Sequence, residues 1–597
     1  MISSVNYLLE KTNCKKMFKF ITLFVVGLTL SVSARDWWEN GNFYQVYPRS
    51  FKDSNGDGVG DLNGVAQKIE YLRDLGMDGV WLSPIMKSPM ADFGYDISDY
   101  YQVQAEYGSL DDLLRLIEKA HSVGLKLILD FVPNHTSDEH EWFQKSVAND
   151  SYYRDFYIWH DGKINSETGE REPPSNWLSQ FKYSAWEWND QRQQYYLHQF
   201  GVKQPDLNYR NPNVVAAMKD VLNFWMDHGI DGFRIDAVPF LFESEIDPET
   251  GTYPDEPVAA DTSACPDPTD WCHLEHPHTN SLPECIDMVY QWRQVIDAWK
   301  LEHNSTTKIL LTEAYTSFEN LMKMYGDGQR NGSHVPFNFE MLANLNKGST
   351  AEDYRYYVKH WVDNMPDDVY ANWVLGNHDN RRVASRFGPQ RKDLLNIFLQ
   401  TLPGISVTYN GDEYGAEDVE FSWEDSVDPQ ACNADPETYQ RYTRDPVRAP
   451  FRWDSSANAG FSSATKTWLP VGEGYENNNV KAQLAADNSH LKIFLRVNKL
   501  RREEPAFSGH SVDPVVVDNV LVYERNPPYG TTGDSFLVVL NIGDVDVPLD
   551  LSQYAQKVGQ QVEVSVSSLH SGLEPGQVVD SGDFVAKANV GYVLRLI

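Results

Sequence analysis

Short apolar segments alternate with amphipathic helical segments along most of the chain. Apolar runs of about four to eight residues predict buried strands, whereas apolar positions three and four residues apart predict helices. The predicted strands are 43–48, 79–85, 125–132, 232–238, 308–314, 335–341, 372–377 and 405–409. Helices are predicted between them, for example at 65–75, 110–123, 212–228 and 286–301. Eight strand–helix units predict an α/β fold with a closed (β/α)8 barrel, the TIM-barrel architecture.

Two segments interrupt this alternation, and a third segment departs from it. Residues 137–208 are rich in Trp, Tyr and Asn and predict a subdomain inserted after the third strand. Residues 241–284 form an acidic, Pro-rich insertion. Further on, the pattern changes to alternating apolar and polar positions, which predicts a C-terminal antiparallel all-β domain at 506–597. The catalytic barrel is therefore expected in two parts, 35–136 and 209–505.

A basic and then apolar segment opens the chain. Four lysines precede or enter an apolar run at 20–30, and small residues at 32–34 provide a cleavage site. This is the pattern of a secretory signal peptide at 1–34, with Met17 as an alternative start. The run is too short for a comfortable membrane span, so no span is expected. A buried N-terminal helix is the alternative interpretation.

The net charge of the chain restricts the kinds of molecule that it is expected to bind. The 597-residue chain is 41% apolar, enough for a large core, and its 86 acidic and 51 basic residues give a net charge of −35. Removal of the signal peptide would take away four lysines and one glutamate and leave the chain more acidic still. Such a surface repels phosphate backbones and anionic membranes, so nucleic acid is not an expected partner. We expect a secreted, extracellular protein with an uncharged substrate.

Cysteines and glycosylation sequences also fit an extracellular protein. Beyond the signal peptide the cysteines are Cys265, Cys272, Cys285 and Cys432. An even number predicts two disulfides with three possible pairings, and Cys265 and Cys272 are close enough to close a short loop. Zinc binding is the alternative, but no His lies at ligand spacing. Glycosylation acceptors are predicted at Asn149, Asn304 and Asn331, whereas Asn134 ends an apolar strand and is expected to be inaccessible.

The segment after the first predicted strand has the oxygen ligands of a calcium loop. Carboxylate or amide oxygens fall at Asp53, Asn55, Asp57 and Asp61. The segment is not an EF-hand, because its twelfth position is Gly64 rather than Glu and because a strand precedes it. An Asx-rich turn without metal is the alternative.

Polar residues recur at the carboxyl ends of the predicted strands. They are Asp130, Arg234, Asp236, Glu313 and Asp379, with His135 and His378 at matching ends. These ends converge on one face of a parallel barrel, and several charges there indicate catalysis more than a structural ion pair. Hydrolysis of a glycosidic bond requires two carboxyl groups, a nucleophile and a proton donor. We expect Arg234 to keep Asp236 ionised, while like-charged neighbours keep Glu313 protonated.

Four of these segments resemble the signature regions of the α-amylase family, glycoside hydrolase family 13. They are DFVPNH at 130–135, GFRIDA at 232–237, TEA at 312–314 and NHD at 377–379. The segment QPDLN at 204–208 resembles the fifth motif of the α-glucosidase and oligo-1,6-glucosidase branch. The resemblance runs from about Trp37 to the C-terminus, and secreted insect maltases are similar throughout.

The resemblance implies a retaining mechanism through a covalent glucosyl-enzyme. It implies Asp236 as the nucleophile, Glu313 as the general acid and then base, and Asp379 as the carboxylate that stabilises the transition state. The implied substrate-binding residues are Asp92, Tyr95, His135, Arg234, Ala237, His378 and Arg444. Among these, Asp92 holds the non-reducing end of the sugar and Arg444 pairs with it. Such a closed end implies an exo-acting enzyme with a one-glucose pocket.

The resemblance also implies a cofactor and a linkage preference. A structural Ca²⁺ ion is implied at Asp53, Asn55, Asp57, Asp61 and the carbonyl of Val59. Strand alternation is expected to turn the side chain of Ala237 away from that of Asp236, although Ala237 can still shape the neighbouring sugar site. A small residue at this position accompanies α-1,4 preference in similar enzymes. The expected substrates are therefore maltose and short maltooligosaccharides, with sucrose as a further candidate and isomaltose as a poor substrate.

Two other functions fit the same fold. Barrels of this family serve as heavy chains of amino-acid transporters, but those have a membrane anchor and generally lack the catalytic residues. A sucrose-acting or glucosyl-transferring enzyme would use the same residues, because water and sugar compete for one intermediate. A lipid anchor is not expected, because residues 592–597 form a charged strand rather than a hydrophobic tail.

Overall fold

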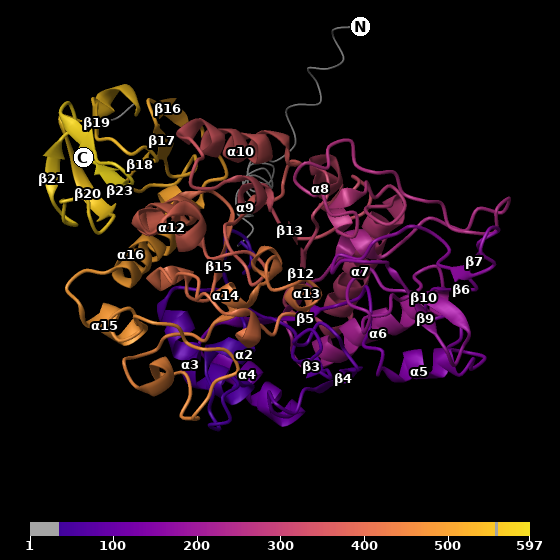
Figure 1. Ribbon diagram of the computed structural model, residues 1–597. Coiled ribbons are helices and arrows are strands. Elements are labelled where there is room, and N and C mark those ends of the chain that lie inside the picture. Colours follow the sequence, from indigo (N-terminus) through magenta and orange to yellow (C-terminus); the bar gives the residue numbers. More distant parts are fainter. Residues whose placement is uncertain (1–34, 556–558) are drawn as a thin grey trace, which may run out of the picture.

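The computed structural model describes residues 35–555 and 559–597, so the signal peptide predicted at 1–34 lies outside the described residues. A barrel occupies the centre, an inserted subdomain lies on one side of it, and a C-terminal β domain lies on the other (Figure 1). None of the described helices is long and apolar enough to cross a membrane.

An eight-stranded parallel sheet forms the barrel, which confirms the predicted fold class. Its strands are β1 (Asn42–Val46), β2 (Gly79–Leu82), β5 (Lys126–Phe131), β11 (Gly232–Ile235), β12 (Ile309–Thr312), β13 (Val335–Pro336), β14 (Asn372–Val374) and β15 (Ile405–Tyr409). Their order is β13-β12-β11-β5-β2-β1-β15-β14. Among the described strands, no backbone ladder joins β13 to β14. The side chain of Asn372 bridges them: Nδ2 donates to the carbonyl of Pro336 at 2.6 Å, and Oδ1 accepts from the backbone N–H of Asn338 at 2.7 Å.

Helices cover the outside of this sheet. The main ones are α3 (Leu62–Asp74), α4 (Leu110–Ser122), α6 (Pro212–Asp227), α7 (Pro283–His303), α8 (Phe318–Met324), α9 (Glu340–Asn344), α10 (Ala351–Asn364), α12 (Lys392–Thr401) and α16 (His490–Glu503). Helix α4 shows why the sequence forms them. Ser109 and Asp112 form a capping box at its N-terminus, and its apolar positions at helical spacing are buried. It begins and ends within one residue of its predicted bounds.

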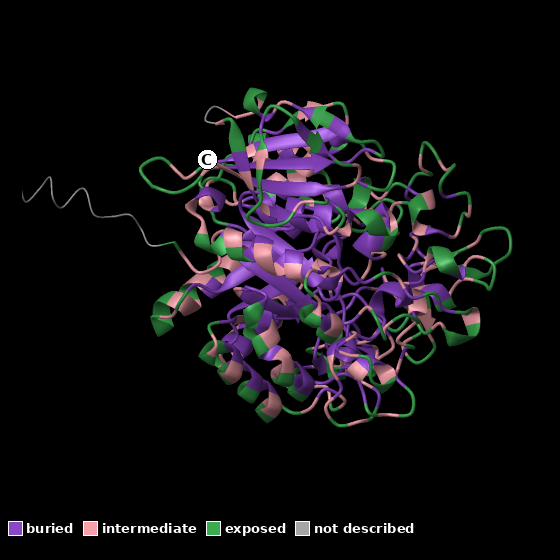
Figure 2. Ribbon diagram, turned by 90° about the vertical axis from the view of Figure 1, so that its left-hand side faces the viewer, coloured by how far each residue is buried: buried purple, intermediate pink, exposed green. Residues whose placement is uncertain are grey.

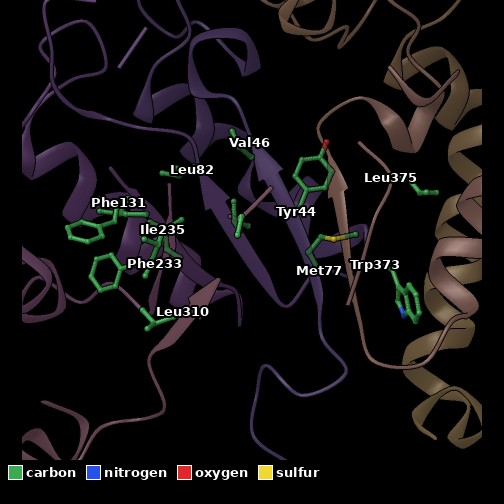
Figure 3. Close-up of a cluster of buried hydrophobic side chains, with 14 of the residues drawn as sticks. Tyr44, Val46, Met77, Leu82, Phe131, Phe233, Ile235, Leu310, Trp373 and Leu375 are labelled. Atoms are coloured by element: carbon green, nitrogen blue, oxygen red, sulfur yellow. The ribbon is translucent and has the colours of Figure 1, made fainter. Parts of the chain in front are cut away.

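Residue alternation divides each barrel strand between the helices and the interior. Phe233 and Ile235 of β11 pack in the layer between the sheet and the helices, together with Phe131 of β5 (Figure 3). Burial of each such side chain stabilises the fold by about 1.5–3 kcal/mol. Arg234, between them, points into the barrel. The register places Arg234 beside Asp130 of β5, so charged groups meet at the carboxyl ends of the strands.

The inserted subdomain at 137–208 contains one short helix and two small antiparallel sheets. These are α5 (Glu141–Val147), the sheet of β6 (Trp159–His160), β10 (Gln194–Leu197) and β9 (Trp186–Asn189), and the ribbon of β7 (Lys163–Ile164) and β8 (Arg171–Glu172). Trp177 and Trp186 form the centre of its core, and Tyr253 of the insertion at 241–284 joins them. The two insertions therefore pack against each other.

The C-terminal domain is an antiparallel β structure that begins after α16. Its main sheet has the order β16 (Val515–Val517), β17 (Val520–Arg525), β18 (Phe536–Asn541), β23 (Gly591–Leu596), β20 (Gln561–Ser567) and β21 (Val578–Asp580). A separate pair, β19 (Val547–Leu549) and β22 (Phe584–Ala586), packs on the same core. Figure 2 shows that the strands of both sheets are largely buried, whereas exposed residues concentrate on the helices and loops.

The structure corrects the prediction of two disulfides. Cys265 and Cys272 are bonded, but Cys285 and Cys432 are free. Cys285 is buried in the first turn of α7, whereas Cys432 is exposed at the end of the short helix α13 (Pro429–Cys432), so each thiol lies in a separate environment. The three predicted glycosylation acceptors are exposed, and Asn134 is buried.

Candidate active site

Arg234 is the centre of a buried charge cluster at the carboxyl end of β11. Its Nη1 lies 2.9 Å from Asp130 Oδ1 and 2.6 Å from Asp236 Oδ1, and its Nη2 lies 2.6 Å from Glu313 Oε2. The guanidinium also lies over the ring of Trp81, 4.9 Å from its centroid. One cation thus serves three carboxyl groups, which leaves excess negative charge if all three are ionised.

Burial, together with this imbalance of charge, raises the pKa of Asp236 and Asp130. Burial, opposed by Arg234 and reinforced by the charge of Glu313, raises the pKa of Asp236 well above its ordinary value. Burial also raises the pKa of Asp130 to about 6. Asp236 therefore keeps a proton at pH values where an isolated aspartate would not. Arg234 lowers the pKa of Asp236 as expected, but three carboxyl groups share its guanidinium and burial outweighs its effect.

Asp379 has the opposite environment. Its Oδ1 lies 2.9 Å from Arg448 Nη2 and 3.5 Å from Arg444 Nη1, and its Oδ2 lies 3.4 Å from His378 Nε2. Although burial alone would raise the pKa of Asp379, the guanidinium groups of Arg448 and Arg444 lower it below its usual range. Asp379 is therefore ionised at neutral pH.

Asp92 and Arg444 close the inner end of the site. Arg444 Nη2 lies 2.9 Å from Asp92 Oδ1 and 2.6 Å from Asp428 Oδ1. Gln204 donates from Nε2 to Asp92 Oδ2 at 3.2 Å. The ring of Phe181 lies 5.1 Å from the Arg444 guanidinium. The side chains of Asp92, Asp428 and Arg444 are 5%, 0% and 12% exposed, so we infer that the pocket is blind at this end.

Two neutral histidines line the wall. Burial lowers the pKa of His135 to about 3 and that of His378 well below its ordinary value. The hydroxyl of Tyr95 is 2.6 Å from His378 Nε2, and the two rings stack with centroids 5.3 Å apart. His135 Nε2 is 3.1 Å from Gln204 Nε2. Both histidines are thus uncharged hydrogen-bonding groups, suited to sugar hydroxyls.

One pocket of about 420 Å³ brings the predicted residues together. Its lining includes Asp92, Tyr95, His135, Asp236, Ala237, Glu313, His378, Asp379 and Arg444. Arg234 lies behind Asp236 and Glu313 rather than at the surface of the pocket. The remaining lining is part aromatic and part amide: it consists of Phe181, Phe200, Phe240, Trp271 and Tyr315, of Gln180, Gln204, Asn280, Asn380 and Gln430, and of Pro239. A cavity of this size with a few convergent polar groups is typical of a small-ligand site.

Ala237 lies differently from its expected position. Strand β11 ends at Ile235, and Ala237 adopts a left-handed backbone with φ 50°. Strand alternation therefore does not set the direction of its side chain, which lines the pocket. Its backbone N–H donates to Glu313 Oε2 at 3.2 Å. A left-handed backbone disfavours β-branched residues, so both the pocket and the backbone limit this side chain.

Sequence reasoning missed several residues that build the site. Arg448 follows Arg444 by four residues, and the short helix α14 (Asp445–Arg448) brings it to Asp379. That spacing is a signal that could have revealed it. Asp428 lies before α13 in an irregular segment and has no comparable signal. Trp271 comes from the insertion at 241–284, whose place beside the pocket depends on tertiary packing.

The predicted calcium loop is internally hydrogen-bonded. Asp53 accepts from three backbone N–H groups of the loop, and Asp61 caps α3 by accepting from the N–H of residue 64. Asp57 accepts from the side chain of Asn55 and from the backbone N–H of Val59. In the described part of the chain, no three Asp, Glu, His or Cys side chains converge as metal ligands. The oxygen donors suit calcium, but ligation would require some of them to leave these amides.

Comparison with known proteins agrees with this geometry. The family described as "Alpha amylase, catalytic domain" matches residues 45–509. Maltase A1 of Drosophila melanogaster is 57% identical over 574 residues, which cover 96% of this chain and 98% of that protein. Salivary alpha-glucosidase of Aedes aegypti is 50% identical and covers 97% of each chain. A solved structure of an alpha-glucosyl transfer enzyme, XgtA, matches with a TM-score of 0.78 at 33% identity and covers 94% of this chain and 100% of that one. This chain therefore belongs to the α-amylase family.

Proposed function

We propose that this protein is an exo-acting, retaining α-glucosidase that releases glucose from the non-reducing end of maltose and short maltooligosaccharides. The observation that carries the proposal is the shared contact of Arg234 with Asp236 and Glu313 in a blind pocket. The names of the full-length relatives, maltase and alpha-glucosidase, support the same reaction.

The reaction follows from two carboxyl groups held on one guanidinium. Asp236 attacks the anomeric carbon while Glu313 gives its proton to the glycosidic oxygen, so a glucosyl ester forms and the second sugar leaves. Water then attacks the same carbon and gives its proton to Glu313, which breaks the ester and frees the glucose. The mechanism requires a protonated Glu313 and an ionised Asp236 when the sugar binds, because only a carboxylate can attack and only a carboxylic acid can donate the proton.

The spacing of the two groups supports retention. Both contact Arg234, and Glu313 also accepts from the backbone N–H beside Asp236, so the carboxyl groups lie close together. An inverting enzyme needs a longer separation, roughly 6.5–9.5 Å, to admit a water molecule between the carboxylate and the sugar. The ionised Asp379 is placed to hold sugar hydroxyls and to stabilise positive charge in the transition state.

The blind inner end supports exo action. The ion pair of Asp92 and Arg444 blocks further extension of a chain, so a terminal glucose is the unit that fits. The aromatic side of the pocket is then left for the sugar that leaves. A longer substrate would extend outward through this mouth.

Product analysis tests the proposal. Purified protein is incubated with maltose, maltotriose, sucrose, isomaltose and starch, and the anomeric form of released glucose is followed by proton NMR. We expect α-glucose as the first product, maltose and maltotriose as preferred substrates, and little action on starch. Release of β-glucose or of internal fragments would contradict the mechanism. Transfer products in place of free glucose would support the glucosyl-transferring alternative.

We also propose that the protein is secreted. The predicted signal peptide, the exposed glycosylation acceptors and the Cys265–Cys272 disulfide support this location. Expression of the full chain in insect cells should yield protein in the medium with Arg35 at its N-terminus. Retention of uncleaved chain in the cells would contradict the proposal.

A structural calcium ion is the last part of the proposal. Asp53, Asn55, Asp57, Asp61 and the carbonyl of Val59 would hold it, and the ion would fix the loop before α3. Because Asp61 also caps α3, Asp57→Ala is the cleaner variant. We expect chelator to lower the Tm of the wild-type protein and to leave that of Asp57→Ala unmoved, because the ion binds only the folded state. Absence of calcium in metal analysis of the wild type, with no response to chelator, would leave only an Asx-rich turn.

A further inference from the structure

Three distant segments of the chain meet around the aromatic mouth of the pocket. They are the hairpin tip at 179–183 in the inserted subdomain, the loop closed by the disulfide at 265–272, and the segment 430–442. The backbone N–H of Tyr183 donates to the carbonyl of Thr269 at 2.8 Å, and Asn433 Nδ2 donates to the carbonyl of Phe181 at 2.8 Å. The mouth is therefore assembled from parts that no local sequence signal connects.

Lys182 lies where the three segments meet. Its Nζ is 2.8 Å from Asp267 Oδ2 and 3.4 Å from Asp270 Oδ1, and it lies 5.1 Å from the ring centroid of Tyr442. The Tyr442 hydroxyl donates to both carboxylate oxygens of Asp270 at 2.9 Å. The side chains of Lys182 and Asp270 are 8% and 4% exposed, whereas that of Asp267 is 39% exposed, so the cluster is buried on the side of Asp270 and open on the side of Asp267. We call these four side chains the Lys182 clasp.

The backbone under the clasp is unusual. Lys182 has φ 72° and Tyr183 has φ 64°, so two consecutive residues other than glycine occupy the left-handed region. Such conformations are unfavourable and persist where the surrounding structure requires them, often beside functional sites. Here they turn the hairpin tip so that Lys182 reaches the disulfide loop.

Asp270 of the clasp is adjacent in sequence to a residue that lines the pocket. Trp271 directly follows Asp270, and its indole lines the pocket. The ring stacks on His276 with centroids 3.8 Å apart and lies 6.2 Å from Phe240, which belongs to the turn that follows the nucleophile strand. Trp271 is partly exposed, so it stands at the mouth rather than at the blind end. An aromatic face at this point suits the apolar face of the departing sugar.

We propose that Lys182 is a positioning residue that holds Trp271 at the mouth through Asp267 and Asp270, and that Trp271 determines specificity for the leaving sugar. The inference rests on the proposed α-glucosidase function. Without the Lys182 ammonium, two neighbouring carboxylates lose their common cation and repel each other. The loop is then free to move Trp271 away from the sugar, while the blind end keeps its own ion pairs.

Two substrates with different leaving groups distinguish an effect at the mouth of the pocket from an effect at its blind end. Maltose leaves a glucose at the mouth, whereas α-glucosyl fluoride leaves only a fluoride ion. We expect Lys182→Met and Trp271→Leu each to lower kcat/KM for maltose by roughly 10-fold or more, mainly through KM, and to leave kcat/KM for the fluoride unchanged. The double variant should be no worse than the more impaired single variant, because both residues act as one unit.

Lys163→Met is the matched control. Lys163 lies in β7 of the same subdomain and forms no ion pair with any residue that the structure describes. It should leave both substrates unaffected, and circular dichroism should show all variants folded. Equal losses on maltose and fluoride, or unchanged kinetics with a lowered Tm, would make Lys182 a stabilising residue only and overturn the inference. Failure of the wild type on both substrates would instead overturn the proposed function.

Discussion

Strand β11 begins and ends beside a buried aspartate, and the two surroundings are opposite. Asp231, just before the strand, lies 2.6 Å from His121 Nε2, 3.1 Å from Lys126 Nζ and 3.7 Å from Lys308 Nζ. At the other end Asp236 shares one guanidinium with two further carboxyl groups. One end therefore has an excess of cations and the other an excess of carboxylates.

The same burial has opposite consequences at the two ends. Although burial alone would raise the pKa of Asp231, the hydrogen bond with His121 and the charge of Lys308 lower it. The pKa of Asp236 is raised, because Arg234 does not outweigh burial and the neighbouring charge. The ratio of cations to carboxylates thus separates a group that stabilises the barrel from groups prepared for proton transfer.

The largest expected effect is on catalysis, at the carboxyl end of β11 where Asp236 lies. Asp236→Asn removes the nucleophile, because an amide cannot form the glucosyl ester. We expect a loss of maltose hydrolysis on the order of 10⁴-fold or more, with an unchanged or higher Tm because a strained charge is removed. The checks are steady-state kinetics and thermal unfolding. A variant that keeps a tenth of wild-type activity would refute the assignment.

At the amino end of β11, an aspartate-to-asparagine substitution at Asp231 should affect stability instead of catalysis. Asp231→Asn leaves three basic groups without their carboxylate, and we expect the free energy of unfolding to fall by about 2–3 kcal/mol. The value of kcat/KM for maltose should be unchanged. Urea unfolding and kinetics of the folded variant measure the two quantities. Reduced activity with unchanged stability would break the comparison between the two ends.

A smaller effect, on linkage preference, is expected at Ala237, which follows Asp236 and lines the pocket. Ala237→Val adds two methyl groups that narrow the space for an acceptor approaching through its ring hydroxyl. We expect relative kcat/KM to shift toward isomaltose by roughly 10- to 100-fold, equivalent to about 1–3 kcal/mol. Ala237→Gly, which suits the backbone at φ 50°, is the control and should not favour isomaltose. Wild-type protein that cleaves isomaltose faster than maltose would refute the linkage preference.

The smallest effect is a difference in pH dependence. The folded pKa of Asp231 is lowered, so its ion pairs stabilise the protein above the unfolded pKa of about 3.9, and this contribution is lost as the pH falls toward the folded pKa. The folded pKa of Asp236 is raised, so its charge costs stability as the pH rises above about 3.9.

Melting curves of both variants across about pH 3–7 are the measurement. The Tm deficit of Asp231→Asn should be full above about pH 5 and shrink toward pH 3, whereas the Tm of Asp236→Asn relative to the wild type should rise as the pH increases above about 4. Parallel shifts in the two variants would show that the two ends do not differ electrostatically.

The sequence was most informative where local pattern determines structure. The barrel strands and the side chains at their ends were predicted because alternation and strand-end position specify both. Strand β13 was predicted too long, because Pro336 cannot donate to a ladder and the chain then turns toward Asn372. The conformation of Ala237 escaped prediction because its positive φ is imposed by the surrounding site, including Glu313.

Residues that depend on distant packing were not predictable. Asp428 holds Arg444 from a segment without regular structure. Lys182 and Trp271 belong to two separate insertions, and only the folded chain brings their segments together. The acidic composition likewise gave no indication that one end of β11 would gather cations.

The bridge that Asn372 forms between β13 and β14 determines where the barrel can open locally. Within residues 35–555 and 559–597, the side-chain amide of Asn372 joins the facing edges of β13 and β14, whereas the other neighbouring strands of this sheet are joined by a backbone ladder. Local opening fluctuations should therefore concentrate at this seam, so its amides should exchange with deuterium faster than those between β5 and β11. The seam between β13 and β14 is therefore the place where we expect the barrel to open first.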